Sequence, residues 1–167
     1  IMAILDKHDI LFWLDCGTCL GAYRYGGVIP WDFDVDIAIL SDDSQNVWRA
    51  LKELDPKKYV VQDWSGRDLP ETLLMVYVKE SRSLIDIYHF NIDDNGETVS
   101  SILSNEHSIF LPESWRIRER RYSVPTPIST VFPLKRGEFD GLTVPVPNKT
   151  KEYLQLRYGE NINPNHI

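Results

Sequence analysis

The sequence has no apolar run that approaches the roughly 20 residues of a membrane-spanning helix, so we expect no membrane span in this chain. It also lacks an excess of basic residues: 18 Lys and Arg stand against 25 Asp and Glu, and the formal net charge is −7. Because non-specific nucleic-acid binding needs a basic face, this balance argues against a nucleic-acid partner. A chain of 167 residues can bury a sizeable core, and we predict one domain over residues 1–167.

No signal peptide opens the sequence. The chain begins at Ile1 instead of Met, inside a helical pattern formed by Ile1, Ile4 and Leu5. We therefore expect that the natural protein continues before Ile1, and that a targeting segment can lie there.

Cysteine is scarce, and Cys16 and Cys19 are the only two. Their C-x-x-C spacing allows a zinc or a redox interpretation. Zinc needs four ligands, and the sequence has no second pair and no His-x-His spacing to complete the set. The redox motif fits loosely, since a helix is expected here after a strand, but Gly17-Thr18 between the cysteines already explains the turn. We expect both thiols to pack as small residues around the site described next.

Three carboxylates, Asp32, Asp34 and Asp36, occupy alternate positions just before an apolar stretch that is typical of a strand. Residues two apart in a strand point to the same face, so Asp34 and Asp36 can converge on one metal ion. Like charges packed this closely repel one another, and a cation relieves that repulsion. Hard oxygen ligands suit Mg²⁺ or Mn²⁺ better than zinc.

A Gly17-Thr18 turn lies upstream, between a short apolar strand and a helix. Such a turn exposes backbone N–H groups and a hydroxyl, which together favour an anion. A phosphate-binding turn followed by a strand with Asp-x-Asp is the arrangement that metal-dependent phosphoryl chemistry needs. The sequence therefore predicts a phosphate site at Gly17 and Thr18 beside the metal site.

A third ligand is expected from a neighbouring strand. Residues 83–90 are apolar except for Asp86, which is flanked by Leu84, Ile85 and Ile87. An aspartate in such a strand is rarely buried without a partner. A nearby arginine or amide would satisfy it, but with Asp34 and Asp36 waiting for a third ligand, we predict Asp86 at the metal.

The remaining pattern predicts an alternation of helices and strands. Helices are expected over residues 1–9, 17–25, 41 or 42 to about 54, and 150–158. Strands are expected over residues 11–15, 34–40, 59–63, 73–79 and 83–90, with turns at 80–82 and 93–96. The prolines between residues 125 and 147 argue against a helix there and favour short strands.

The front of the chain follows one long pattern, G-T-x-L-G-x-x-R and then G-x-I-P-W-D-x-D-h-D. The residues on this pattern are Gly17, Thr18, Leu20, Gly21, Arg24, Gly27, Ile29, Pro30, Trp31, Asp32, Asp34 and Asp36. The pattern resembles the signature of the LicD family, which includes bacterial phosphocholine transferases and fukutin-type ribitol-phosphate transferases. Phe132-Pro133-Leu134-Lys135 and Phe139-Asp140-Gly141-Leu142 resemble distal elements of the same family. Residues 91–121 match no part of it, and we expect acceptor choice to depend on them.

The resemblance implies an α+β fold, with a nucleotidyltransferase-like mixed β-sheet flanked by helices. It also implies a metal-dependent transferase that moves a phospho-alcohol group, phosphocholine or an alditol phosphate, from a CDP-activated donor to a sugar hydroxyl of a glycan. The location would be cytoplasmic in a bacterial protein and the Golgi lumen in a fukutin-type protein.

Several basic and aromatic residues are candidates for substrate contacts. We expect Arg24, beside the Gly-Thr turn, and Lys135 to contact phosphate, and Trp31 to stack on a base or sugar or else to pack beneath a loop. A basic run, formed by Arg116, Arg118, Arg120 and Arg121, is either a solvated face or a site for an anionic acceptor. His89 is expected to be packed and not catalytic.

In the predicted reaction, Asp34, Asp36 and Asp86 hold the metal, and Asp32 or Asp86 accepts the proton of the acceptor hydroxyl. Alternatively, Asp32 organises the surrounding shell. Three other interpretations stay open: a nucleotidyltransferase that moves an NMP to a small acceptor, a non-catalytic binding module derived from the same fold, and a structural domain with a solvated acidic edge.

Overall fold

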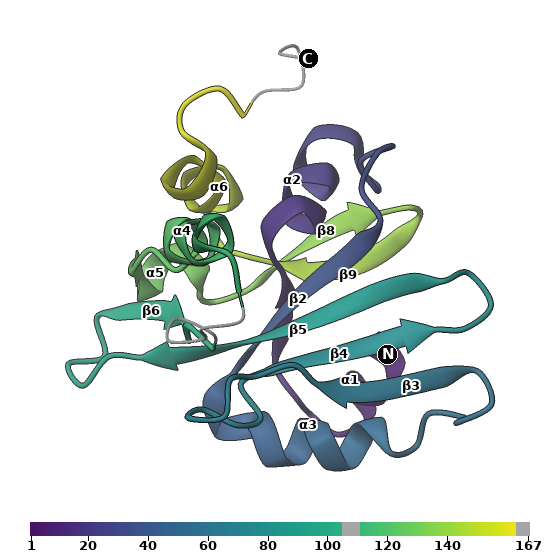
Figure 1. Ribbon diagram of the computed structural model, residues 1–167. Helices are drawn as coiled ribbons and strands as arrows, with labels where there is room; N and C mark the ends of the chain where they lie inside the picture. Colours follow the sequence, from purple (N-terminus) through teal and green to yellow (C-terminus); the bar gives the residue numbers. More distant parts are fainter. Residues whose placement is uncertain (105–110, 163–167) are drawn as a thin grey trace.

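A mixed β-sheet organises the chain in the computed structural model, which describes residues 1–104 and 111–162 (Figure 1). Its strands are β1 (Phe12–Leu14), β2 (Asp34–Leu40), β3 (Tyr59–Asp63), β4 (Leu73–Val78), β5 (Ser83–Ile92), β6 (Thr98–Ser101) and β7 (Thr126–Pro127). A separate hairpin consists of β8 (Lys135–Phe139) and β9 (Leu142–Val146). The helices are α1 (Met2–Lys7), α2 (Cys16–Tyr25), α3 (Ser44–Leu51), α4 (Glu113–Tyr122), α5 (Ile128–Val131) and α6 (Thr150–Tyr158), with a 3₁₀ turn at Ser41–Asp43.

The strand order is β1-β2-β5-β4-β3, with β6 beside the far end of β5 and β7 beside β6. Strands β2 and β5 are parallel, and the other pairs of this sheet are antiparallel. A parallel pair needs a crossover connection, which α3, β3 and β4 supply here. The observed mixed sheet flanked by helices confirms the predicted α+β class.

One face of the sheet is an apolar core. Ile37 and Ile39 of β2 and Ile87 of β5 alternate with the residues of the opposite face and are fully buried. Helix α3 covers this face with Val47, Ala50 and Leu51, and Figure 1 shows it lying against the sheet below β4 and β3. The apolar side chains of this face therefore fix the direction in which the alternate residues of β2 and β5 point.

The opposite face is filled by aromatic rings at its β1 end. Trp13 contacts Phe90 and Phe132 edge-on, with ring centroids 5.2 and 5.5 Å apart. Such pairs add stability beyond the area that they bury. Farther along β5 the same face carries polar groups, and there it is left open for the site.

Three helices differ from the sequence prediction. Pro127 immediately precedes α5, so the prolines between residues 125 and 147 did not exclude a helix; proline is well suited to the start of a helix, where its missing N–H has no partner to lose. Helix α4 was not predicted, because its polar sequence has no apolar stripe. The predicted helix to about Leu54 ends at Leu51, and turn hydrogen bonds continue to Leu54.

A buried polar group joins α6 to the start of α2. The Tyr153 hydroxyl donates to Asp15 Oδ1 at 2.6 Å, and the Arg157 Nε lies 3.8 Å from the same oxygen. Arg157 also lies over the Tyr153 ring at 3.6 Å, and all three side chains are at most 2% exposed. Because a buried carboxylate is costly without partners, this group fixes the residue that precedes the Gly-Thr turn.

We predict that Tyr153→Phe destabilises the fold by about 1–3 kcal/mol, because the buried Asp15 carboxylate loses its shortest hydrogen bond. Urea denaturation followed by circular dichroism measures the change. Tyr158→Phe is the matched control on the same helix. Its expected cost is smaller, because the Tyr158 hydroxyl has no hydrogen-bond partner among the described residues. Equal costs for the two variants would contradict a specific role for the Tyr153 hydroxyl.

In the part of the chain that the structure describes, no helix is long and apolar enough to traverse a membrane.

Candidate functional site

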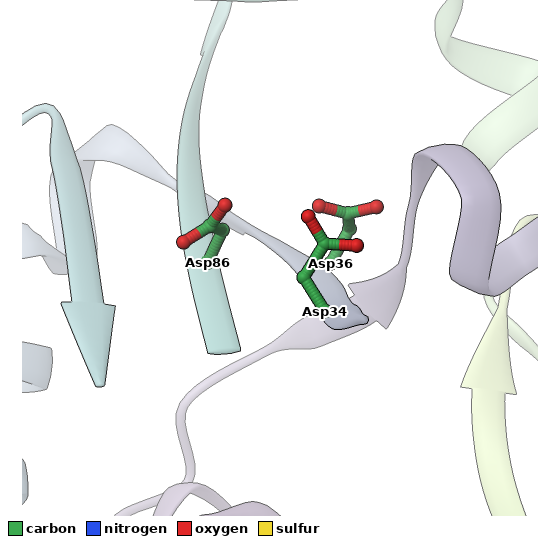
Figure 2. A group of neighbouring side chains, drawn as sticks. All are labelled: Asp34, Asp36 and Asp86. Atoms are coloured by element: carbon green, nitrogen blue, oxygen red, sulfur yellow. The ribbon is translucent and has the colours of Figure 1, made fainter. Parts of the chain in front are cut away.

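Three aspartates converge where the parallel strands β2 and β5 lie side by side (Figure 2). Asp36 is paired directly with Asp86 across the two strands, and Asp34 precedes Asp36 by two residues on the same face. One carboxylate oxygen from each residue lies within 4.8 Å of the others. The predicted convergence of Asp34, Asp36 and Asp86 is confirmed as a geometric fact.

The Gly-Thr turn is fastened to this strand pair. The backbone N–H of Asp36 donates to the Thr18 hydroxyl at 2.8 Å, and the N–H of Asp15 donates to the Asp36 carbonyl at 3.1 Å. Thr18 is buried, and its hydroxyl therefore holds β2 in place. A phosphate contact by Thr18 stays a prediction, and its hydroxyl hydrogen is the group that would make it.

Glycine at residue 17 leaves room for the Asp32 carboxylate beside the turn. A Cβ built on Gly17 would lie 2.5 Å from Asp32 Oδ2 and 3.9 Å from Asp36 Oδ2. The absence of a side chain thus lets Asp32 lie against the helix start, next to the three converging aspartates. Helix α2 ends two turns later, and the cap residue Gly26 has the left-handed φ of 67° that favours glycine.

The site has an excess of negative charge that its surroundings do not neutralise. Burial raises the pKa of Asp36 well above its usual range, and Asp34, Asp15 and Asp86 raise it further. Burial and the charge of Asp34 raise the pKa of Asp86 to about 6, while Arg118 opposes the rise. Burial, followed by a hydrogen bond with Asp34, raises the pKa of Asp32 to about 6. A cation among these groups would reverse the shifts.

The donor set fits a hard divalent ion. All three converging groups are carboxylates, which suit Mg²⁺ or Mn²⁺. Asp86 Oδ1 is buried without a hydrogen-bond partner among the described residues, which is a costly state for a carboxylate oxygen unless a ligand occupies it. Asp34, Asp36 and Asp86 are therefore the residues that could hold a metal.

A cavity of about 500 Å³ lies between the sheet and α4, and Asp34 and Asp86 are among the residues that line it. Asp15, Cys16, Asp34 and Asp86 lie at its acidic end. Its walls are largely apolar and include Trp64, Leu73, Met75, Leu84, Tyr88 and Trp115. A low-dielectric enclosure beside charged groups strengthens electrostatic contacts to a bound ligand.

Three predicted substrate contacts are not brought to this cavity. Arg24 donates to the backbone carbonyls of Asn161 and Ile162 at 3.0 and 2.9 Å, so it anchors the chain after α6. Lys135 begins β8 and lines a different hollow, beside Leu11. Trp31 precedes the aspartates in a loop and is 63% exposed, so it does not pack beneath that loop. Its stacking on a base or sugar stays a prediction.

That α4 contributes residues to the cavity was not predicted from the sequence. Trp115, Arg118, Glu119 and Tyr122 all line the cavity, and they recur at the i, i+3, i+4, i+7 spacing of one helix face. The basic run therefore has one member, Arg118, that faces the site. The spacing of aromatic and charged residues was present in the sequence, but it is not the apolar periodicity that indicates a helix.

Three other groups behave as predicted. His89 is fully buried on the core face, and burial lowers its pKa to about 4, so it is neutral packing. Cys19 is buried and Cys16 lines the cavity, both as free thiols. Burial raises the pKa of both cysteines, and raised values disfavour the reactive thiolate.

The family model for the LicD/FKTN/FKRP nucleotidyltransferase domain matches residues 9–149. The chain belongs to the LicD family. The matched span contains the Gly-Thr turn and the three aspartates. It also runs across residues 91–121, so the expectation that they match no part of the family is wrong. Assignment to this family confirms the resemblance stated for the front motif.

Two of the relatives that match this LicD-family chain have names that state an enzymatic activity. Human ribitol 5-phosphate transferase FKRP is 24% identical over 97% of this chain. The lipopolysaccharide cholinephosphotransferase LicD of Haemophilus influenzae is 39% identical over 28% of it. The chain spans 30% of the first relative's length and 18% of the second's.

The fold of this LicD-family domain is that of a nucleotidyltransferase. The lincosamide antibiotic adenylyltransferase LnuA aligns with 96% of this chain and 83% of its own, with a TM-score of 0.54 and 15% identity. The predicted nucleotidyltransferase-like architecture is thereby confirmed.

We predict that Asp36→Asn stabilises the metal-free protein relative to wild type, and more so at pH 7 than at pH 4. With folded pKa values raised above the unfolded value, the folded state retains protons that the unfolded chain releases, so wild-type stability is lost as pH rises through the folded values.

The difference is measured by urea denaturation in EDTA from pH 4 to pH 7. Asp94→Asn, in the exposed turn after β5, is the control and should show a pH-independent difference. A gap between Asp36→Asn and wild type that stays constant with pH would contradict the charge-repulsion account.

Proposed function

We propose that this domain is the catalytic domain of a metal-dependent transferase that moves a phospho-alcohol group from a CDP-activated donor to a sugar hydroxyl of a glycan. The observation that carries the proposal is the convergence of Asp34, Asp36 and Asp86, two of which (Asp34 and Asp86) line a cavity large enough for a nucleotide-sized ligand. Membership of the LicD family supports the reaction class.

Asp34, Asp36 and Asp86 would hold Mg²⁺ or Mn²⁺, with Asp86 Oδ1 contributing its unpartnered lone pairs. A bound divalent ion would neutralise donor phosphate charge and polarise the phosphorus. The three carboxylates sit on two hydrogen-bonded strands and hold fixed positions, as efficient electrostatic stabilisation requires.

Asp32 is the better candidate for accepting the proton of the acceptor hydroxyl. Its side chain is partly exposed beside the metal ligands, and a carboxylate there can act as a general base. Asp86, the other predicted proton acceptor, is occupied as a ligand in this arrangement. Asp32 therefore has the access that an incoming hydroxyl needs.

The transferred group is phosphocholine or an alditol phosphate. The activities that name the two relatives, ribitol 5-phosphate transfer and cholinephosphate transfer, support this class. Trp31 and Phe33 flank Asp32 and are 63% and 86% exposed, so they would offer flat apolar rings to a sugar acceptor.

We predict that the purified domain with Mg²⁺ releases CMP from CDP-choline or CDP-ribitol, with slow transfer to water in the absence of a glycan. Phosphorus NMR follows CMP and the released phosphocholine or ribitol phosphate. Asp36→Asn should lower the rate by at least about 100-fold, because the metal carboxylates act on the transition-state charge. Asp94→Asn, which removes an exposed carboxylate outside the site, should retain the wild-type rate.

The products separate the alternatives. Pyrophosphate released from a nucleoside triphosphate, with no CMP from either CDP-alcohol, would indicate nucleotidyl transfer instead. Full CMP release by Asp36→Asn would contradict the assigned metal site. Donor binding without turnover in the presence of glycan acceptors would favour a non-catalytic module.

A further inference from the structure

Helix α4 places one cation in the cavity that Asp34 and Asp86 line. Of the described residues that line this cavity, Arg118 is the only Lys or Arg. Arg118 and the aspartates thus act on the same enclosed space.

The guanidinium of Arg118 stacks on a neighbouring ring and forms no ion pair among the described residues. Its central carbon lies 4.7 Å from the centre of the Trp115 ring, a stacking that restricts its orientation. Arg116 and Arg120 instead form ion pairs with Glu113 at 2.6 and 3.7 Å. Among the residues that the structure describes, Arg118 forms no such pair, so its five N–H donors are available to an acceptor.

The chemistry of this arrangement selects a phosphate. A planar guanidinium presents parallel N–H groups that match two phosphate oxygens, and a stacked guanidinium loses little further freedom when it binds. A phosphate bound between Arg118 and the aspartates would contact the Arg118 guanidinium on one side. On its other side, a divalent ion held by the carboxylates would separate the phosphate charge from the negative charge of the aspartates.

We infer that Arg118 binds the diphosphate of the donor from the α4 side of the cavity. The inference rests on the proposed function and deepens it. It assigns to α4 the phosphate contact that sequence reasoning gave to Arg24 and Lys135, both of which lie away from the cavity. It also gives the basic run a role in donor binding and not in acceptor binding.

Inorganic pyrophosphate with Mg²⁺ is the probe, and calorimetry gives its affinity for each variant. Arg118→Gln should bind pyrophosphate about 10- to 100-fold more weakly than wild type, because it loses a charge-assisted hydrogen-bond pair. Arg118→Lys should fall between the two. Arg121→Gln removes the same charge from the same helix outside the cavity lining, and we expect its affinity within about twofold of wild type.

CMP release from the CDP-alcohols is the second readout. We expect the donor KM to increase for Arg118→Gln and to stay at the wild-type value for Arg121→Gln. If wild type releases CMP and Arg118→Gln matches Arg121→Gln in both assays, the inference is wrong while the proposed function stands. If no CDP-alcohol reacts but pyrophosphate binding depends on Arg118, the inference stands and the proposed function is wrong. Failure of wild type to bind pyrophosphate overturns the inference.

Discussion

The parallel pairing of β2 and β5 is the constraint on which the site depends, because it sets Asp36 directly opposite Asp86. The alternation of a strand then adds Asp34 to the same face while Ile37, Ile39 and Ile87 point into the core. A register shift of one residue would turn the aspartates into the core and the isoleucines into the cavity. The apolar face therefore fixes the functional face.

This arrangement costs stability in the absence of a cation, and the fold supports it from behind. Thr18 holds the backbone of Asp36, and Tyr153 with Arg157 neutralises Asp15 just before the turn. None of these contacts uses a carboxylate oxygen of Asp34, Asp36 or Asp86. Burial, and after it the charges of neighbouring aspartates, raises the pKa values of Asp36 and Asp86, so the fold holds these carboxylates together at a cost.

Much of this could be predicted from the sequence, because the signals are local. Asp34 and Asp36 share a face through strand periodicity, Gly26 ends α2 as a left-handed cap, and a lone charge in an apolar strand identified Asp86. The predicted turn after β5 is also present, with Asp93 accepting hydrogen bonds from the backbone of Glu97 and Thr98.

The rest could not be predicted, because it depends on contacts between distant segments. Helix α4 is mostly polar, so periodicity did not reveal it, and only the tertiary fold brings Arg118 to the cavity. Arg24 is close to the Gly-Thr turn in sequence, but two helical turns separate them, and its partners come from residues after α6. Proximity along the chain was a poor guide to proximity at the site.

The most direct test of the central claim is a Mn²⁺ titration followed by the electron paramagnetic resonance signal of the free ion. The account predicts that wild type and Asp94→Asn remove Mn²⁺ from solution, that Mg²⁺ competes for the same site, and that Asp36→Asn loses this binding. Wild type that leaves the free Mn²⁺ signal unchanged, or Asp36→Asn that binds as wild type does, would contradict the assignment of the three aspartates as a metal site.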